Sequence, residues 1–96
     1  VVNGTATAAD SNVAGFRVFP NPIREGRATV EFEAGGGHVQ VLVFDTTGRE
    51  VLRPLDRVVP RGKQQLALDL SHLAAGAYYC HVQEGSRVST RLVAVE

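Results

Sequence analysis

Apolar and polar residues alternate with a period of two along most of this chain, and turn-forming segments interrupt the alternation at intervals of roughly ten residues. Segment 28–33 reads Ala-Thr-Val-Glu-Phe-Glu, which places apolar side chains on one face of a strand and polar ones on the other. We expect that polar face, Glu31 included, to be solvated. The expected strands cover 16–19, 28–33, 38–44, 49–55, 64–70, 77–83 and 87–95.

The segments between these strands are short and rich in Gly, Pro, Asp and Ser. No window of ten or more residues carries a helical stripe, and residues 71–76 form at most one helical turn or a tight loop, with Ser71 as its cap and Gly76 at its end. Many short strands separated by turns are typical of two packed antiparallel sheets. The sequence therefore predicts an all-β protein, a seven-stranded antiparallel β-sandwich of the immunoglobulin-like kind.

Three turns and one edge strand have individual sequence signals. The prolines in 20–22 fix φ twice and remove two N–H donors, so the first strand ends in a rigid turn. In 45–48 the Asp closes a hairpin and the Gly supplies a positive φ. The Arg53-Pro54 pair indicates an edge strand. Near 76–78, a Gly and a buried Tyr indicate a corner that anchors one sheet to the other.

Composition and charge narrow the class of protein. The chain has 96 residues, 44% of them hydrophobic, with ten basic and ten acidic residues and a net charge of zero. These charges are scattered along the sequence, which has no run of basic residues of the kind that binds nucleic acids or membrane surfaces. A single cysteine, Cys80, excludes an internal disulfide. No signal peptide or apolar run of membrane-spanning length is visible, so we expect a larger precursor to supply any export address.

The residues with catalytic or metal-binding chemistry do not form a site. His38, His72 and His81 have no ligand-pair spacing. Cys80 and His81 point to opposite faces of one strand and cannot act together. Glu31 and Glu33 share a strand face, in a chain too short to build a cleft around them.

Calcium binding through Asp45 or Asp69 stays open, although no calcium-loop signature accompanies either residue. We expect no enzymatic activity, no cofactor and no small-molecule substrate.

Four segments, taken together and in order, resemble the C-terminal sorting domain of type IX (Por) secretion substrates: Val18–Pro22, Val43–Val51, Leu70–Tyr78 and Thr90–Val95. This resemblance implies a sorting domain over 16–96, preceded by a flexible linker from the cargo domain over 1–15. It implies recognition by the outer-membrane translocon and its shuttle protein, followed by cleavage by a sortase and attachment of the cargo to the cell surface. The localisation implied is the periplasm in transit, then the cell surface or the extracellular space, with the isolated domain monomeric.

The residues that carry the resemblance are the candidate recognition residues: Pro20, Asn21, Pro22, Asp45, Gly48, Leu73, Gly76, Tyr78, Arg91, Leu92 and Val93. For the turn and corner residues, maintenance of the fold and direct contact with the machinery are both open. In the last strand, Arg91 stands where the family usually has Lys, and the charge is retained. Val93 and Val95 are expected on the face opposite Leu92.

The last strand has two interpretations. A terminal strand with apolar residues on both faces is suited to strand addition or to a hydrophobic groove, and the alternative is an ordinary core strand. For the whole domain, the rival function is a non-catalytic surface-adhesion or carbohydrate-binding module that stays on the mature protein, although outward aromatic residues are few, chiefly Tyr79 and Phe44. A third interpretation is a structural spacer.

Overall fold

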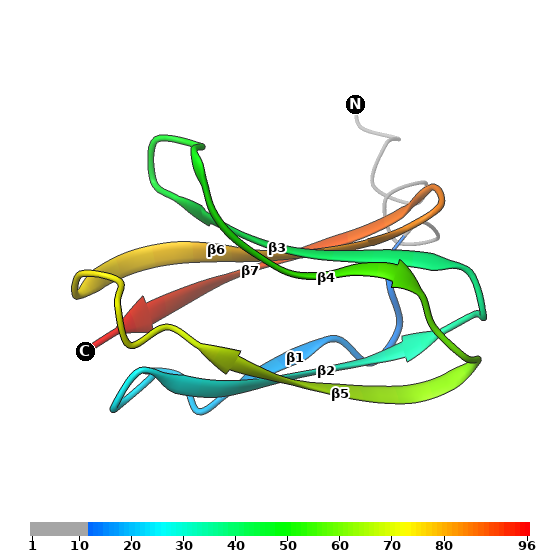
Figure 1. Ribbon diagram of the computed structural model, residues 1–96, viewed down its shortest axis with the longest axis horizontal. Coiled ribbons are helices and arrows are strands. Elements are labelled where there is room, and N and C mark those ends of the chain that lie inside the picture. Colours follow the sequence, from blue (N-terminus) through cyan, green and yellow to red (C-terminus); the bar gives the residue numbers. More distant parts are fainter. Residues whose placement is uncertain (1–11) are drawn as a thin grey trace, which may run out of the picture.

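Seven antiparallel strands in two facing layers make up the structure, a computed structural model that describes residues 12–96 (Figure 1). The strands are β1 (Arg17–Phe19), β2 (Arg27–Ala34), β3 (His38–Asp45), β4 (Glu50–Val58), β5 (Gly62–Asp69), β6 (Gly76–Glu84) and β7 (Arg87–Val95). All of the expected strands occur, with ends that differ by at most three residues. Within residues 12–96 there is no helix long and apolar enough to cross a membrane.

The strands divide unequally between the two sheets. One sheet has the order β1-β2-β5 and the other has the order β4-β3-β6-β7. In the constant-type immunoglobulin order the fourth strand lies beside the fifth, whereas here β4 pairs with β3. The edge position predicted for the strand that contains Arg53-Pro54 is confirmed, since β4 ends its sheet.

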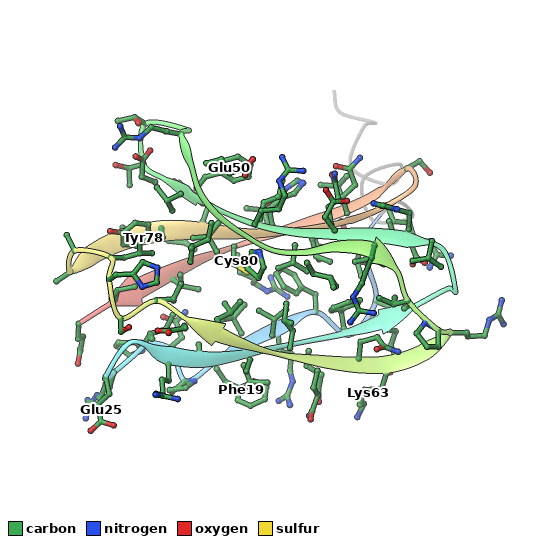
Figure 2. The ribbon with its side chains drawn as sticks, in the orientation of Figure 1. Phe19, Glu25, Glu50, Lys63, Tyr78 and Cys80 are labelled. Carbon is green, nitrogen blue, oxygen red and sulfur yellow. The ribbon has the colours of Figure 1, made fainter. Side chains whose placement is uncertain are left out.

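The hydrophobic core lies between the two sheets and follows the predicted alternation. Buried residues of three central strands supply much of it: Val30 and Phe32 of β2, Val39, Val41 and Val43 of β3, and Cys80 and Val82 of β6. Figure 2 shows Cys80 between the two sheets. Glu50 of β4 and Lys63 of β5 lie away from the core, on the outer sides of their respective sheets. Branched Val side chains suit these pleated surfaces because their χ1 rotamers are restricted.

The prediction of a solvated face on β2 is wrong for Glu31, which is only 7% exposed. Because β2 is the central strand of its sheet, neighbours cover this carboxylate from both sides: Gln65 Nε2 donates to Oε2 at 2.8 Å and Arg17 Nη2 to Oε1 at 2.8 Å. These hydrogen bonds, with that of Gln65 the larger effect, lower the pKa of Glu31 below its usual value. Alternation alone therefore misjudged a residue whose burial depends on long neighbouring side chains.

The connection from β5 to β6 also departs from the prediction. Asp69, not Ser71, caps it: Asp69 Oδ1 accepts hydrogen bonds from the backbone N–H and the hydroxyl of Ser71. Gly26 packs beneath this loop with φ +70°, and a Cβ there would meet Ser71 Cα at 2.5 Å. The Leu70 N–H donates to the Gly26 carbonyl at 2.6 Å. Two loops distant in sequence thus touch through backbone, a role of Gly26 that the sequence pattern did not indicate.

The folded region begins before the boundary drawn at residue 15. Val13 is 4% exposed and belongs to the core, and its N–H donates to Ser89 Oγ. The Ala14 carbonyl accepts a hydrogen bond from the N–H of Glu33. Residues 1–11, most of the predicted linker, lie outside the described residues.

Candidate recognition surface around the last strand

The last strand, β7, has one edge paired with β6 and the other edge facing away from the sheet. Along an antiparallel strand, the N–H and C=O groups of alternate residues point to the same edge. In β7 the residues with even numbers present theirs to the outer edge, as the hydrogen bonds of Leu92 and Ala94 described next establish. The covering of this edge decides what another molecule can reach.

The turn after β1 covers the C-terminal half of the edge, and residues 20–23 are called the clasp below. Asn21 Nδ2 donates to the Leu92 carbonyl at 3.2 Å, and Asn21 Oδ1 accepts from the Ala94 N–H at 3.2 Å. The Ile23 N–H donates to the Ala94 carbonyl at 2.6 Å, and the Glu96 N–H donates to the Ile23 carbonyl at 2.9 Å. Ile23 is fully buried and pairs with Val95 as an isolated parallel bridge.

The residue types of the clasp explain this arrangement. Pro20 and Pro22 have no N–H to offer to a neighbouring strand, and both follow cis peptide bonds. An Asn side chain carries both an amide donor and a carbonyl acceptor. Asn21 therefore supplies to β7, through its side chain, the two hydrogen bonds that a strand residue supplies through its backbone.

The N-terminal half of the β7 edge is more open. Arg91 extends from it towards the start of β1, with its guanidinium carbon 5.7 Å from the centroid of the Phe16 ring and Nη2 3.4 Å from the Phe16 carbonyl. A hollow of about 300 Å³ lies beside it, lined by the segment before β1 and by Ser89, Thr90 and Arg91. Arg91 is exposed, as a recognition residue must be.

The two faces of β7 differ as predicted. Val93 is 2% and Val95 6% exposed, and both belong to the core. Leu92, on the other face, is 57% exposed and lies beside its cross-strand neighbour Tyr79, which is 39% exposed. Val93 was a candidate recognition residue, but its burial against the opposite sheet leaves Arg91 and Leu92 as the accessible members of the trio.

The Asp45–Gly48 hairpin forms as its sequence predicted. Asp45 Oδ1 accepts hydrogen bonds from the Thr47 N–H, the Thr47 hydroxyl and the Arg49 N–H. Gly48 has φ +88°, a conformation that residues with a Cβ rarely adopt. The hydroxyl of Thr47, and then the N–H of Arg49, lower the pKa of Asp45 to about 2 because they stabilise the charged carboxylate.

The corner predicted near residues 76–78 is also present. The Tyr78 hydroxyl donates to the Ala74 carbonyl at 2.7 Å, and the ring is 8% exposed. Gly76 begins β6 with φ +151°. Leu73 packs against the core, and its N–H donates to the Leu70 carbonyl.

These sequence-distant segments converge on one end of the molecule. In the strand registers, Asp45 pairs with Tyr78 and Tyr78 pairs with Val93; Val95 pairs with Gly76 and bridges to Ile23. The hairpin, the corner, the clasp and the chain's last residues accordingly lie together at the left of Figure 1. The turn and corner candidates thus surround the C-terminal end of β7, while Arg91 and Leu92 lie nearer the middle of the strand.

The other chemically active side chains lie apart. His38 contacts Asp56, His81 contacts Thr90 and the ring of Phe44, and His72 is exposed. Burial raises the pKa of the Cys80 thiol to about 12, so it stays protonated. Asp45 and Asp69 each cap their own turn, and residues 12–96 hold no group of three or more His, Cys, Asp or Glu side chains placed to bind a metal ion.

Comparison with known proteins shows the family to which the chain belongs. A family model described as the secretion system C-terminal sorting domain matches residues 17–96. A solved structure from Porphyromonas gingivalis, of PorZ, an essential bacterial surface component of the type-IX secretion system, matches 97% of this chain with a TM-score of 0.60 and 25% sequence identity. The matched region is 12% of that chain, so this chain is far shorter than PorZ. No curated protein matches the sequence.

The clasp gives a first prediction. Asn21→Ala removes both side-chain hydrogen bonds to β7, and we expect it to lower the free energy of unfolding by about 1–2 kcal/mol. Gln83→Ala is the control, because it truncates another surface amide, one that contacts only a turn carbonyl, and we expect a change within about 0.5 kcal/mol. Urea unfolding at neutral pH measures both values. Equal stability of the two variants would contradict the role of the clasp.

The hairpin gives a second prediction, on pH. Since the pKa of Asp45 is lower in the folded than in the unfolded chain, its stabilising effect is complete above about pH 4 and is lost as the pH falls towards 2. Asp45→Asn should therefore melt below the wild type at pH 7, and the difference should shrink between pH 4 and pH 2. Melting temperatures over this range test it, and a gap that does not depend on pH would refute it.

Proposed function

Since the chain belongs to the family of secretion system C-terminal sorting domains, which are sorting signals for type IX secretion, we propose that the outer-membrane translocon of that system recognises this domain and exports the protein attached to it. The family is not catalytic, and its members belong to proteins that are secreted or reach the cell surface. We propose that this chain likewise has no enzymatic activity and that any catalysis during export belongs to its partners.

The observation that supports recognition through the last strand is its combination of anchoring and exposure. Arg91 and Leu92 are exposed, while the next residue, Val93, is in the core. The clasp holds the strand immediately beyond them. We propose that Arg91 and Leu92 contact the machinery, and that Asn21 and its flanking prolines act by fixing the position of these two side chains.

The remaining candidate residues act through the fold in this proposal. Asp45 and Gly48 shape the hairpin whose first residue pairs with Tyr78. Leu73, Gly76 and Tyr78 form the corner from which β6 begins. Because β6 pairs with β7 along its whole length, distortion of either turn would displace the recognition strand.

The route of export is proposed as follows. The precursor crosses the periplasm, a shuttle protein and the translocon take up residues 16–96, and a sortase cleaves in or just before residues 1–15. The cargo then stays at the cell surface or is released. Catalysis belongs to the sortase in this scheme, and the folded domain enters as a monomer.

We propose that the fold is immunoglobulin-like with one strand moved. The groups β1-β2-β5 and β3-β6-β7 correspond to strands A-B-E and C-F-G of the constant-type domain. The fourth strand alone has changed sheets. This arrangement extends the sheet that contains β7, and β7 remains at its edge.

Export of a fluorescent reporter fused to the chain, in a host with a type IX system, tests the proposal. We expect the intact fusion on the cell surface and a fusion that lacks residues 91–96 inside the cell. Because this deletion also removes core residues, Leu92→Asp is the sharper change. Its control is Val58→Asp, at the opposite edge of the same sheet, where the side chain is 63% exposed.

Both point variants should keep the melting temperature of the wild type, and only Leu92→Asp should reduce surface reporter. Surface levels unchanged by the deletion would rule out a sorting role for the last strand. Equal export of the two point variants would remove Leu92 from the recognition surface.

A further inference from the structure

We propose that the outer edge of β7 from Val88 to Leu92 accepts an extended segment of a secretion-machinery protein as an added β-strand, and that a carboxylate of this segment faces Arg91. This inference rests on the proposed function, because it specifies how the machinery holds the sorting signal. It concerns only the half of the edge that the clasp leaves uncovered.

Unpaired backbone groups run along this half of the edge. Val88 and Thr90 direct their N–H and C=O groups outward, as Leu92 does, because alternate residues of the strand face the same edge as Ala94. The clasp uses the Leu92 carbonyl and the groups beyond it. Among residues 12–96, nothing hydrogen-bonds to the outward groups of Val88 and Thr90 or to the Leu92 N–H. Such a row is completed by another strand.

The other edge strands of the two sheets, β4, β1 and β5, are protected against pairing with another chain. β4 contains Pro54, has extra residues at two places in its pairing with β3, and carries ion pairs of Arg53 with Glu50 and Asp56. β1 has only three residues before the clasp. β5 ends in exposed charged residues at Lys63 and Asp69. Edge protection of these kinds disfavours strand addition. On the N-terminal half of the β7 edge, the described segment before β1 makes side-chain contacts only, those of Val13 with Ser89 Oγ and of Phe16 with the Arg91 guanidinium.

The guanidinium of Arg91 places a positive charge beside the open half of the edge. Arg17, Arg24, Arg49 and Arg53 each form an ion pair with a carboxylate of the chain. Within the described part of the chain, Arg91 has no such partner, as is also true of Arg27, Arg57, Arg61 and Arg87. Of these, Arg91 is the one that lies beside the clasp on β7, where its guanidinium contacts the ring and the carbonyl of Phe16.

The side chain of Arg91 also borders the hollow of about 300 Å³, so a side chain of the added strand at this level enters the hollow. A carboxylate is the group that matches a guanidinium there. On the opposite face, exposed Val88 and Leu92 favour apolar neighbours.

Proline substitution on the edge tests strand addition directly. Thr90→Pro removes an outward N–H without removing a backbone hydrogen bond to β6, and it places a ring where the added strand would lie. It also removes the Thr90 hydroxyl that contacts His81 of β6, so folding of the variant is checked first. The matched control is Val58→Pro at the other edge: the Val59 N–H points to the Gly37 carbonyl, so that of Val58 points outward. With both variants folded, as judged by melting, Thr90→Pro should lower surface reporter about tenfold or more and Val58→Pro should not.

Normal export of a folded Thr90→Pro variant would overturn the inference, while export of the wild type and its loss on Leu92→Asp would leave the proposed function standing. If Thr90→Pro does not fold, charge reversal decides the matter. Arg91→Glu should lower export, whereas Arg57→Glu, an exposed arginine of β4 without an ion pair in residues 12–96, should not. Equal export of these two variants would also overturn it.

Two other occupants of the edge are separate outcomes. A melting temperature that falls when residues 1–11 are deleted would assign the edge to the chain's own beginning. A dimer of the purified chain that Thr90→Pro abolishes would assign it to a second copy. Either result contradicts the proposal, and an unchanged melting temperature with a monomer at all concentrations supports it.

Discussion

Hydrogen bonding of the backbone groups along the outer edge of β7 determines how the last strand is held and which of its residues stay accessible. A sheet edge leaves N–H and C=O groups unpaired, and a small two-layer domain has several such edges. In this chain the side chain of Asn21 and the backbone of Ile23 complete the edge at its C-terminal end. They also connect the three-stranded sheet, through the turn after β1, to the last strand of the four-stranded sheet.

This connection explains why segments far apart in the sequence act as one unit. The clasp fixes the end of β7, the corner around Tyr78 fixes the start of β6, and the Asp45 hairpin joins the same register. The exposed Arg91 and Leu92 therefore extend from an anchored strand, because the next residue, Val93, is in the core and the clasp is hydrogen-bonded to Leu92 and Ala94. In the proposed function the machinery recognises the folded domain, because the clasp, the corner and the hairpin together position the strand that carries the two accessible side chains.

Local patterns predicted much of this structure, since strands and turns depend on neighbouring residues. The alternation gave all seven strands, and Asp45, Gly48 and Tyr78 gave the hairpin and the corner. Contacts between distant segments could not be read in the same way. The sequence marked Asn21 as part of a turn, but its partners on β7 are more than 70 residues away. The burial of Glu31 and the pairing of β4 with β3 likewise depend on which strands become neighbours.

β7 has one closed and one open half of its outer edge, and amide hydrogen exchange measured residue by residue distinguishes the two halves. The Ala94 and Glu96 amides are bonded to the clasp, whereas the Val88 and Thr90 amides face outward without a partner in residues 12–96. We expect slow exchange at Ala94 and Glu96 and fast exchange at Val88 and Thr90 under native conditions. Equal protection along the whole outer edge, or fast exchange at Ala94, would contradict this expectation.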